Sequence, residues 1–271
     1  MVTTLVAAAV TRPGVAPVRV GAVVNRNMGA LRSGASYWLV LISGFFEPVF
    51  YLLSIGIGVG ALVGDISVDG RVLPYATFVA PAMLATSAMN GAMAETTFNF
   101  FFKFKYAKTY DAVLATPVRP IEIALGELVW AMMRGSVYTA VFLGVMVVMK
   151  LTTIGWALVA FPATILVGFA FGAIGMIFTT MMRGWQDFDL MATAQFALFL
   201  FSATFAPIAN YPEVFQWIIR VTPLYQAVEM VRDLTTGHPD AGTAVHALYL
   251  VVMMTVGLYF TGRRLERMLL K

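Results

Sequence analysis

Long apolar stretches, interrupted by short polar or basic segments, make up most of this 271-residue chain. Several of them run for more than about twenty residues with one charge or none, which is the length that an α-helix needs to cross roughly 30 Å of hydrocarbon. A transmembrane β-barrel would instead alternate over segments of about ten residues. The pattern therefore predicts an all-α integral membrane protein with six transmembrane helices, at residues 37–63, 74–102, 123–149, 151–182, 190–211 and 243–262.

The segment before the first span is amphipathic. Within residues 17–36, a helix would place Val20, Val24, Met28 and Leu31 on one face, with three arginines interleaved. This arrangement favours a helix that lies in the cytoplasmic interface of the membrane. A basic tail without fixed structure would have the same composition.

Residues 212–237 are also amphipathic rather than continuously apolar. Pro212 and Pro223 each stand where a helix could begin, so we expect two short helices at, or dipping into, the outward interface. The predicted organisation is a cytoplasmic tail with an interfacial helix, a single transmembrane domain and a basic cytoplasmic C-terminus, at residues 1–36, 37–262 and 263–271.

The distribution of charge predicts the topology. An even number of spans places both termini on one side, and if that side is the cytoplasm, most of the 18 Lys and Arg residues lie inside. This is the bias expected from the positive-inside rule. The basic residues flank apolar spans and do not form a stripe, so we expect contact with membrane lipid and no nucleic-acid binding. The predicted location is the cell membrane, with both termini cytoplasmic.

The chain offers little to catalysis. It has no Cys and two His, which excludes thiol nucleophiles and disfavours a metal site. No Lys follows a Gly, so there is no phosphate-binding P-loop, and nucleophile elbows and HExxH helices are also absent. We therefore expect no enzymatic site and no cofactor bound by this chain.

Four charged residues fall within the predicted spans: Glu47, Glu95, Glu127 and Arg134. A charge at the middle of a bilayer costs at least about 2.5–3.5 kcal/mol, so such residues usually face a partner or a cavity. Glu95 and Glu127 are near the cytoplasmic ends of their spans, where the cost falls. Structural ion pairs and a lining of the translocation path both fit these residues.

Three glycines repeat at four-residue spacing in the first span. Gly56, Gly60 and Gly64 would form a ridge of small residues that allows close helix packing. The ridge fits packing within one subunit and a dimer interface equally well.

A basic segment, residues 98–122, separates the second and third spans. It contains Lys103, Lys105, Lys108 and Arg119. On a helix, one face would carry Tyr106, Tyr110, Val113 and Leu114, while Lys108 and Asp111 lie elsewhere and Pro117 ends the helix. Such a helix can dock into a groove of a cytoplasmic partner, although a membrane-surface helix without a partner is the alternative. We predict a partner-coupling region at residues 103–122, with contacts from Tyr106, Lys108, Tyr110, Asp111, Val113, Leu114 and Pro117.

Three segments, in this order along the chain, resemble the ABC-2 family of ABC transporter permeases. They are EPVFYLLSIGIGVG at residues 47–60, KTYDAVLATPVRPIEIALGE at 108–127 and FLFSATFAP at 199–207. The similarity extends over about residues 19–267. Within the family, the chain most resembles the branch of nodulation lipo-oligosaccharide and daunorubicin-type drug exporter permeases.

The resemblance implies a six-span permease that pairs with a second copy or a paralogue. It also implies two ATPase subunits on separate chains, which hold the ATP and Mg that this chain cannot. The region from Tyr106 to Pro117 would be the coupling helix, and residues 212–235 would be the outward re-entrant helices. Substrates in the family are amphipathic, such as drugs, glycolipids and lipid-linked saccharides, and the resemblance does not select among them.

The expected function is export of a hydrophobic or amphipathic compound, driven by the partner ATPase. One rival is an ion-coupled secondary transporter with Glu47, Glu95 and Arg134 as its relay, which would work without ATP. A second rival is a membrane scaffold that only anchors an ATPase. In that case no cargo would alter ATP hydrolysis.

Overall fold

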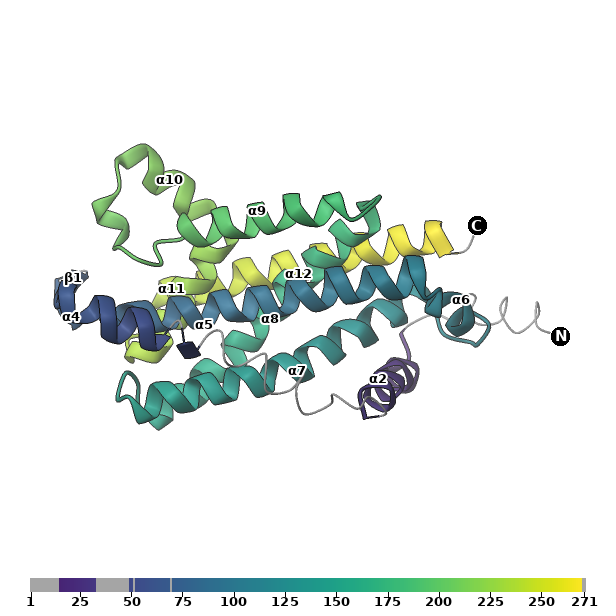
Figure 1. The fold of residues 1–271 in the computed structure, drawn as a ribbon, viewed down its shortest axis with the longest axis horizontal. Helices are drawn as coiled ribbons and strands as arrows, with labels where there is room; N and C mark the ends of the chain where they lie inside the picture. The colour runs from purple at the N-terminus through teal and green to yellow at the C-terminus, as the bar shows by residue number, and fades with distance from the viewer. Residues whose placement is uncertain (1–14, 33–48, 51, 69, 270–271) are drawn as a thin grey trace.

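The computed structural model describes residues 15–32, 49–50, 52–68 and 70–269, with the backbone alone for residues 55–57 and 269. Long helices run side by side along one axis of the molecule (Figure 1). They are α5 (Tyr75–Ala94), α7 (Pro120–Val148), α8 (Ile154–Met181), α9 (Gln186–Leu200) and α12 (Ala241–Leu269).

Helix α8 lies at the centre of the bundle. It has no charged residue, and it packs against α5, α7, α12 and α11 (Pro223–Thr236). Small residues allow this close contact: a Cβ atom built at Gly172 would lie 2.5 Å from Cδ1 of Leu128 on α7. The larger apolar core therefore forms around α8, and a second cluster forms near the start of α7.

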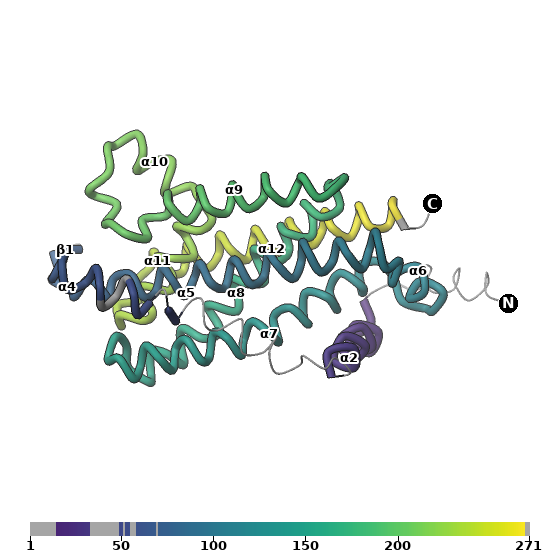
Figure 2. The backbone as a smooth tube through the Cα atoms, viewed as in Figure 1, coloured from purple at the N-terminus to yellow at the C-terminus, as the bar shows by residue number. Residues whose placement is uncertain are grey.

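The shorter elements gather at the two ends of the bundle. At one end, which we call the α6 end, lie α2 (Pro17–Arg32) and α6 (Thr109–Leu114), close to where α12 finishes (Figure 1). At the opposite end, the α10 end, lie α4 (Gly60–Val63) and α10 (Glu213–Val221). Figure 2 shows the chain leaving α9 in a wide loop, which includes the 3₁₀ turn η4 (Ile208–Asn210), before it reaches α10.

Helix α5 continues beyond its α-helical part. Two π-helical segments, η2 (Glu95–Asn99) and η3 (Phe102–Tyr106), extend it without a break to Tyr106. The hydroxyl groups of Thr96 and Thr97 donate to the carbonyls of Ala92 and Met93, and such back-bonding competes with regular helical hydrogen bonds. The first part of the basic segment is thus a helical extension of the second predicted span.

Three of the described helices are long and apolar enough to cross a membrane: α7, α8 and α12. They match three of the predicted spans. The predicted span at 190–211 is shorter than expected, because α9 ends at Leu200 and a buried turn at Ser202–Thr204 follows it. Residues 263–269, predicted as a basic tail, continue α12. Residues 37–48, which form the first part of the first predicted span and include Glu47, lie outside the described part of the chain. The six-span count therefore stays a prediction.

A β-hairpin follows the first predicted span. Strands β1 (Asp65–Val68) and β2 (Arg71–Pro74) pair antiparallel, with Ile66 opposite Leu73. Gly70, with φ of 78°, supplies the left-handed backbone of the turn. The description of the protein as all-α is corrected in this detail. The π-helical segment η1 (Ser54–Val59) precedes α4.

Candidate functional site

Helix α6, the predicted coupling helix, turns its aromatic residue inward. Tyr110 is 1% exposed, and its ring lies 5.1 Å from that of Phe100. Val113 and Leu114 are partly buried in the same cluster. The prediction of one outward aromatic face is therefore wrong, for a local reason: Lys108 has a left-handed backbone (φ 47°), which ends the preceding helix and changes the phase between Tyr106 and Tyr110.

The surface that α6 leaves open combines polar residues with alanine and proline. Its exposed residues are Lys108, Asp111, Ala112, Ala115, Thr116 and Pro117. Tyr106, half exposed, stacks on Trp185 with ring centroids 5.5 Å apart. Lys105 donates to the carbonyls of Met182 and Arg183 at the end of α8. Part of the predicted basic flank therefore binds the chain itself.

Glu122, which the sequence did not single out, anchors α2 to the start of α7. Its Oε1 accepts from the backbone N of Ala16 at 2.9 Å and lies 3.2 Å from Nη2 of Arg19. Its Oε2 accepts from the backbone N of Arg119 at 2.9 Å, as a helix-capping glutamate does. Nη1 of Arg19 donates to the carbonyl of Pro117 at 2.8 Å, so α2 also holds the turn after α6. Pro120 at the helix start, followed by Glu122, was the available signal.

Glu127, one turn and a half further along α7, is a second anchor. It is 6% exposed and binds three groups from two other elements. Arg26 and Asn27 of α2 donate to it at 3.1 and 3.0 Å, and Lys103 of η3 donates at 2.6 Å. Glu127 therefore joins α2, α7 and the end of the α5 extension, and it forms a structural ion pair. The described contacts do not place it in a cavity.

Glu95 and Arg134 form an ion pair between η2 and α7. Nη2 of Arg134 also approaches the hydroxyl of Tyr138 at 3.5 Å. Both charged residues line a cavity of about 570 Å³ between α5, α7, α8 and α9. The sequence left two interpretations open, a structural ion pair and a lining of the translocation path. This pair is compatible with both, because its two charges neutralise each other and both residues face the cavity.

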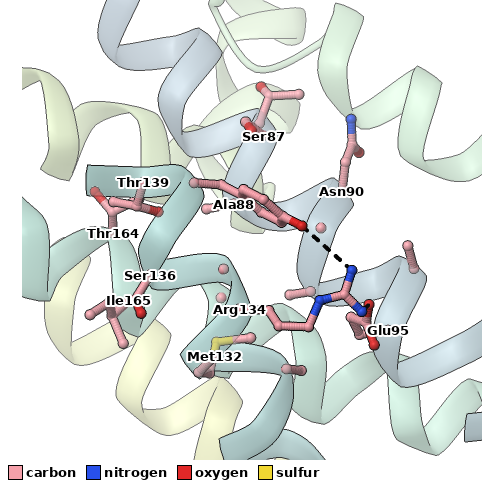
Figure 3. Close-up of a pocket in the computed structure, with 18 of the residues that line it drawn as sticks. Ser87, Ala88, Asn90, Glu95, Met132, Arg134, Ser136, Thr139, Thr164 and Ile165 are labelled. Carbon is pink, nitrogen blue, oxygen red and sulfur yellow. Dashed lines mark hydrogen bonds and ion pairs between the residues drawn. The ribbon is translucent and has the colours of Figure 1, made fainter. Parts of the chain in front are cut away.

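Figure 3 shows how the two residues lie. Arg134 and Glu95 point toward each other at one side of the cavity, and Asn90 and Ser87 lie along α5. Several other lining residues are apolar, such as Met132 and Ile165, so the wall of the cavity is mixed in character. An apolar pocket with a few polar groups is the usual form of a site for small amphipathic molecules.

The remaining predicted residues have different outcomes. Glu47 lies outside the described residues. Gly60 is the first residue of α4, and Gly64, with φ of 71°, is the residue that follows its last turn. Gly64 is therefore outside the helix, and the predicted ridge of three glycines on one helix face does not include it. Among the described residues, no group of three or more His, Cys, Asp or Glu side chains could hold a metal ion.

Arg232 is a buried charged residue in the segment 212–237, which the sequence predicts to be amphipathic. It is 5% exposed in α11, and its guanidinium lies 3.9 Å from the centre of the Phe78 ring. It donates to the carbonyls of Phe78 and Ala203 at 3.3 and 3.1 Å and pairs with Glu229. Arg232 thus fastens the turn after α9 to α5 and α11 at the α10 end. Its partners Phe78 and Ala203 are far away in the sequence, so helical periodicity could not reveal it.

Comparison with known proteins gives a consistent result. Residues 22–236 match the family model described as ABC-2 type transporter. The chain is 33% identical over 256 residues to Nodulation protein J of Sinorhizobium fredii, covering 92% of this chain and 93% of the relative. It is 32% identical over 233 residues to Nodulation protein J of Rhizobium leguminosarum bv. trifolii, covering 85% and 87%. The same protein of Rhizobium meliloti is 30% identical over 237 residues, with coverage of 85% and 87%.

Proposed function

Because the chain belongs to the ABC-2 type transporter family, we propose that it is the membrane-spanning subunit of an ABC exporter. It moves a hydrophobic or amphipathic compound outward, and ATP is hydrolysed with Mg on a separate ATPase subunit. The observation that carries this proposal is the exposed surface of α6. It projects at one end of the bundle, directly between the α5 extension and α7, so that force on α6 acts on two long helices at once.

The ATPase docks on the α6 end, which is the cytoplasmic side. The positive-inside rule supports this orientation, because the α6 end carries Arg19, Lys105, Lys108 and Arg183. Lys108 and Asp111 offer opposite charges to the partner, and Ala112 and Ala115 let a partner surface approach closely. Two ATPase subunits would bind a pair of permeases.

The second permease subunit packs beside α9. Met191 of this helix is buried, whereas Leu190 and Phe196 are 73% and 60% exposed. An apolar face of this kind could be covered by lipid or by protein. Gln195, on the same helix, is polar and lines the cavity, which favours a protein neighbour over lipid. A second copy or a paralogue would close the cavity over these residues.

The cargo passes through the cavity that Glu95 and Arg134 line. Its mixture of Phe, Met, Ser and Asn side chains suits a molecule with an apolar part and a polar part, such as a drug, a glycolipid or a lipid-linked saccharide. Because the ion pair is internally neutral, it does not demand a charged cargo.

The test begins with association. The permease is co-expressed with a Walker-type ATPase from a neighbouring reading frame and purified through a tag on the permease. Ala112→Trp places a bulky ring on the exposed surface of α6 and should weaken association at least about tenfold, as loss of an interface hot spot does. Asp65→Lys, an exposed change at the α10 end, is the matched control and should leave association intact.

Transport assays then separate the functions. Proteoliposomes that hold the complex should expel a fluorescent amphipathic dye only with ATP, and the dye should change the rate of ATP hydrolysis. Transport that survives ATP depletion and stops when a proton gradient collapses would instead support the ion-coupled transporter. Association without any effect of cargo on ATP hydrolysis would support the scaffold.

A further inference from the structure

A shallow groove lies between α8 and α12. Its volume is about 560 Å³, and it shares no lining residue with the cavity of Glu95 and Arg134. One wall is Ile174 of α8, and the other runs along α12 from Val245 to Val256. Several of these side chains are more than half exposed, so the described part of the chain leaves the groove open to another molecule.

The groove is apolar along its whole length. Its lining side chains are Ile, Val, Leu and Met, apart from Tyr249. The hydroxyl of Tyr249 donates to the carbonyl of Val221 at 2.9 Å, so its hydrogen is already used. Such a surface suits a hydrocarbon chain and offers no partner to a polar group.

The same face of α12 leads from the groove to two arginines. Arg263 follows Val245 by 18 residues and Val256 by seven, which are close to five turns and two turns of an α-helix, so the three lie on one face. Arg267 is one turn further along. Both arginines are exposed, and they lie in the part of α12 that finishes at the α6 end (Figure 1). One helix face is therefore apolar at first and basic at its end.

The guanidinium of Arg263 lies closer to the groove than its own backbone does. It is placed over the ring of Tyr259, 4.7 Å from the centroid, and Tyr259 is one turn nearer the groove. This direction is the usual one, because side chains on a helix lean toward its N-terminus. A tyrosine at this position is also typical of the boundary between hydrocarbon and headgroups.

The two arginines carry charge that the fold does not neutralise. Of the other charged residues nearby, Arg264 donates to a hydroxyl of α8 at 2.8 Å, and Glu266 lies 3.9 Å from Arg119. In the described part of the chain, no carboxylate is within ion-pair distance of Arg263 or Arg267. Two guanidinium groups on successive turns therefore face outward beside an apolar groove.

The dimensions match one leaflet of a bilayer. At about 1.5 Å per residue, the groove is roughly 17 Å long from Val245 to Val256. One half of the hydrocarbon core is about 15 Å thick. Tyr259, where the guanidinium of Arg263 lies, is roughly 5 Å beyond Val256. A lipid whose acyl chain fills the groove thus brings its phosphate to the two arginines.

A second copy of the chain fits this face less well. A two-fold axis along the bilayer normal would place equivalent residues at the same depth, so Arg263 and Arg267 of each copy would meet those of the other. Like charges brought together in this way are costly. A phosphate, by contrast, accepts paired hydrogen bonds from guanidinium groups.

We propose that this groove and the two arginines form a binding site for one anionic phospholipid of the leaflet at the α6 end. The acyl chain lies along Val245–Val256, and the phosphate is bound by Arg263 and Arg267. Because neither arginine has a carboxylate beside it, the site favours a headgroup with net negative charge over one whose phosphate is balanced by an ammonium group. The site does not depend on an ATPase, so it stands or falls separately from the proposed function.

The test is native mass spectrometry of the purified protein in detergent, titrated with equal amounts of phosphatidylglycerol and phosphatidylcholine that have the same acyl chains. We expect the parent to retain one phosphatidylglycerol, with at least about tenfold preference. The double variant Arg263→Gln with Arg267→Gln should lose that preference. Arg32→Gln with Arg183→Gln removes two exposed charges at the same end outside α12, and this control should bind as the parent does.

A second pair of variants tests the groove itself. Val252→Trp fills the groove and should lower the occupancy of both lipids at least about tenfold, with both arginines in place. Val137→Trp on α7 is the matched control, because Val137 is 50% exposed, Val252 is 53% exposed, and Val137 lies outside the groove. All variants are compared with the parent by melting temperature, so that loss of the fold is recognised.

Three results would overturn the proposal. The double arginine variant could retain the preference of the parent, or the control pair could lose as much, which would mean a general attraction of lipid to basic residues. Val252→Trp could bind both lipids as the parent does, which would place the acyl chain elsewhere. Finally, the parent could retain no lipid and form dimers that Val252→Trp disrupts, which would make a second copy the occupant of the groove.

Discussion

Gly126 of α7 gives the sharpest test of how α2 is held. A Cβ atom built at this glycine would lie 2.5 Å from Cβ and 2.7 Å from Cγ1 of Val23, and 3.1 Å from the carbonyl oxygen of Val20. A rotamer change moves Cγ1, but Cβ and the carbonyl oxygen are fixed to the backbone of α2. Gly126→Ala must therefore push α2 away from α7 and lengthen the contacts of Glu127.

The magnitude follows from two opposing effects. Overpacking a close contact costs about 1–3 kcal/mol, and replacing Gly by Ala inside a helix recovers about 1 kcal/mol. Gly126→Ala should therefore lower the free energy of unfolding by about 0–2 kcal/mol. Gly135 is on the same helix, and a Cβ atom there would meet no other atom within 4 Å. Gly135→Ala should therefore gain helix propensity without any cost from overpacking. The difference between the two variants isolates the close approach and should be about 1–3 kcal/mol.

The measurement is the thermal unfolding midpoint of the purified protein in detergent, with both variants in one buffer. Gly126→Ala should melt below Gly135→Ala. Adding Val23→Gly removes the fixed Cβ and should raise the melting point of Gly126→Ala, although the same change lowers that of the parent. If Gly126→Ala melts with or above Gly135→Ala, α2 does not pack on α7 as the structure describes.

Three further predictions concern other buried or partly buried charged residues. Arg232→Leu should cost about 3–5 kcal/mol, since it leaves the paired glutamate and two buried carbonyls without their donor; loss of monodisperse protein after mild heating measures it. Glu95→Gln and Arg134→Gln should each destabilise the protein more than the double variant does, a non-additivity that a thermal double-mutant cycle detects. The pKa of Asp233, on α11 outside the candidate spans, is raised to about 6, chiefly by burial. The folded state therefore prefers the protonated form, so stability is greatest below about pH 4 and falls as pH rises through 6. Asp233→Asn should melt above the parent at pH 7.5 and close to it at pH 4.5.

Apolar runs predicted the long helices well. The spans expected at 123–149, 151–182 and 243–262 correspond to α7, α8 and α12, each within a few residues at its start. Local chemistry explains this success, because Pro120 begins α7 and the side chain of Thr153 caps α8. The length and the uninterrupted hydrophobicity of a segment do not depend on its neighbours in the fold, so both can be read directly from the sequence.

The candidate site was less accessible to prediction, for two physical reasons. First, helical phase holds only within one helix, and the left-handed backbone at Lys108 reset the phase between Tyr106 and Tyr110. Second, an amphipathic pattern does not say what covers the apolar face. The ring of Tyr110 packs against other residues of this chain and not against a partner. Arg232, on the polar face of α11, is buried by residues far away in the sequence, such as Phe78. Only the tertiary structure supplies those neighbours.

Two clusters of buried charge contact the continuous α5 helix at positions whose separation matches the thickness of a bilayer. Phe78 of α5 receives Arg232 at the α10 end, and Lys103, on the same continuous helix, meets Glu127 at the α6 end. At about 1.5 Å per residue these positions are roughly 38 Å apart, which is more than the hydrocarbon thickness of about 30 Å. Each cluster can thus lie at an interface, where burial of charge is least costly. The ion pair of Glu95 with Arg134 of α7 lies between them, and Glu95 is the first residue of the π-helical segment η2. Because π-helical turns inside α-helices occur frequently at functional sites, this position agrees with a functional role for the cavity that the pair lines.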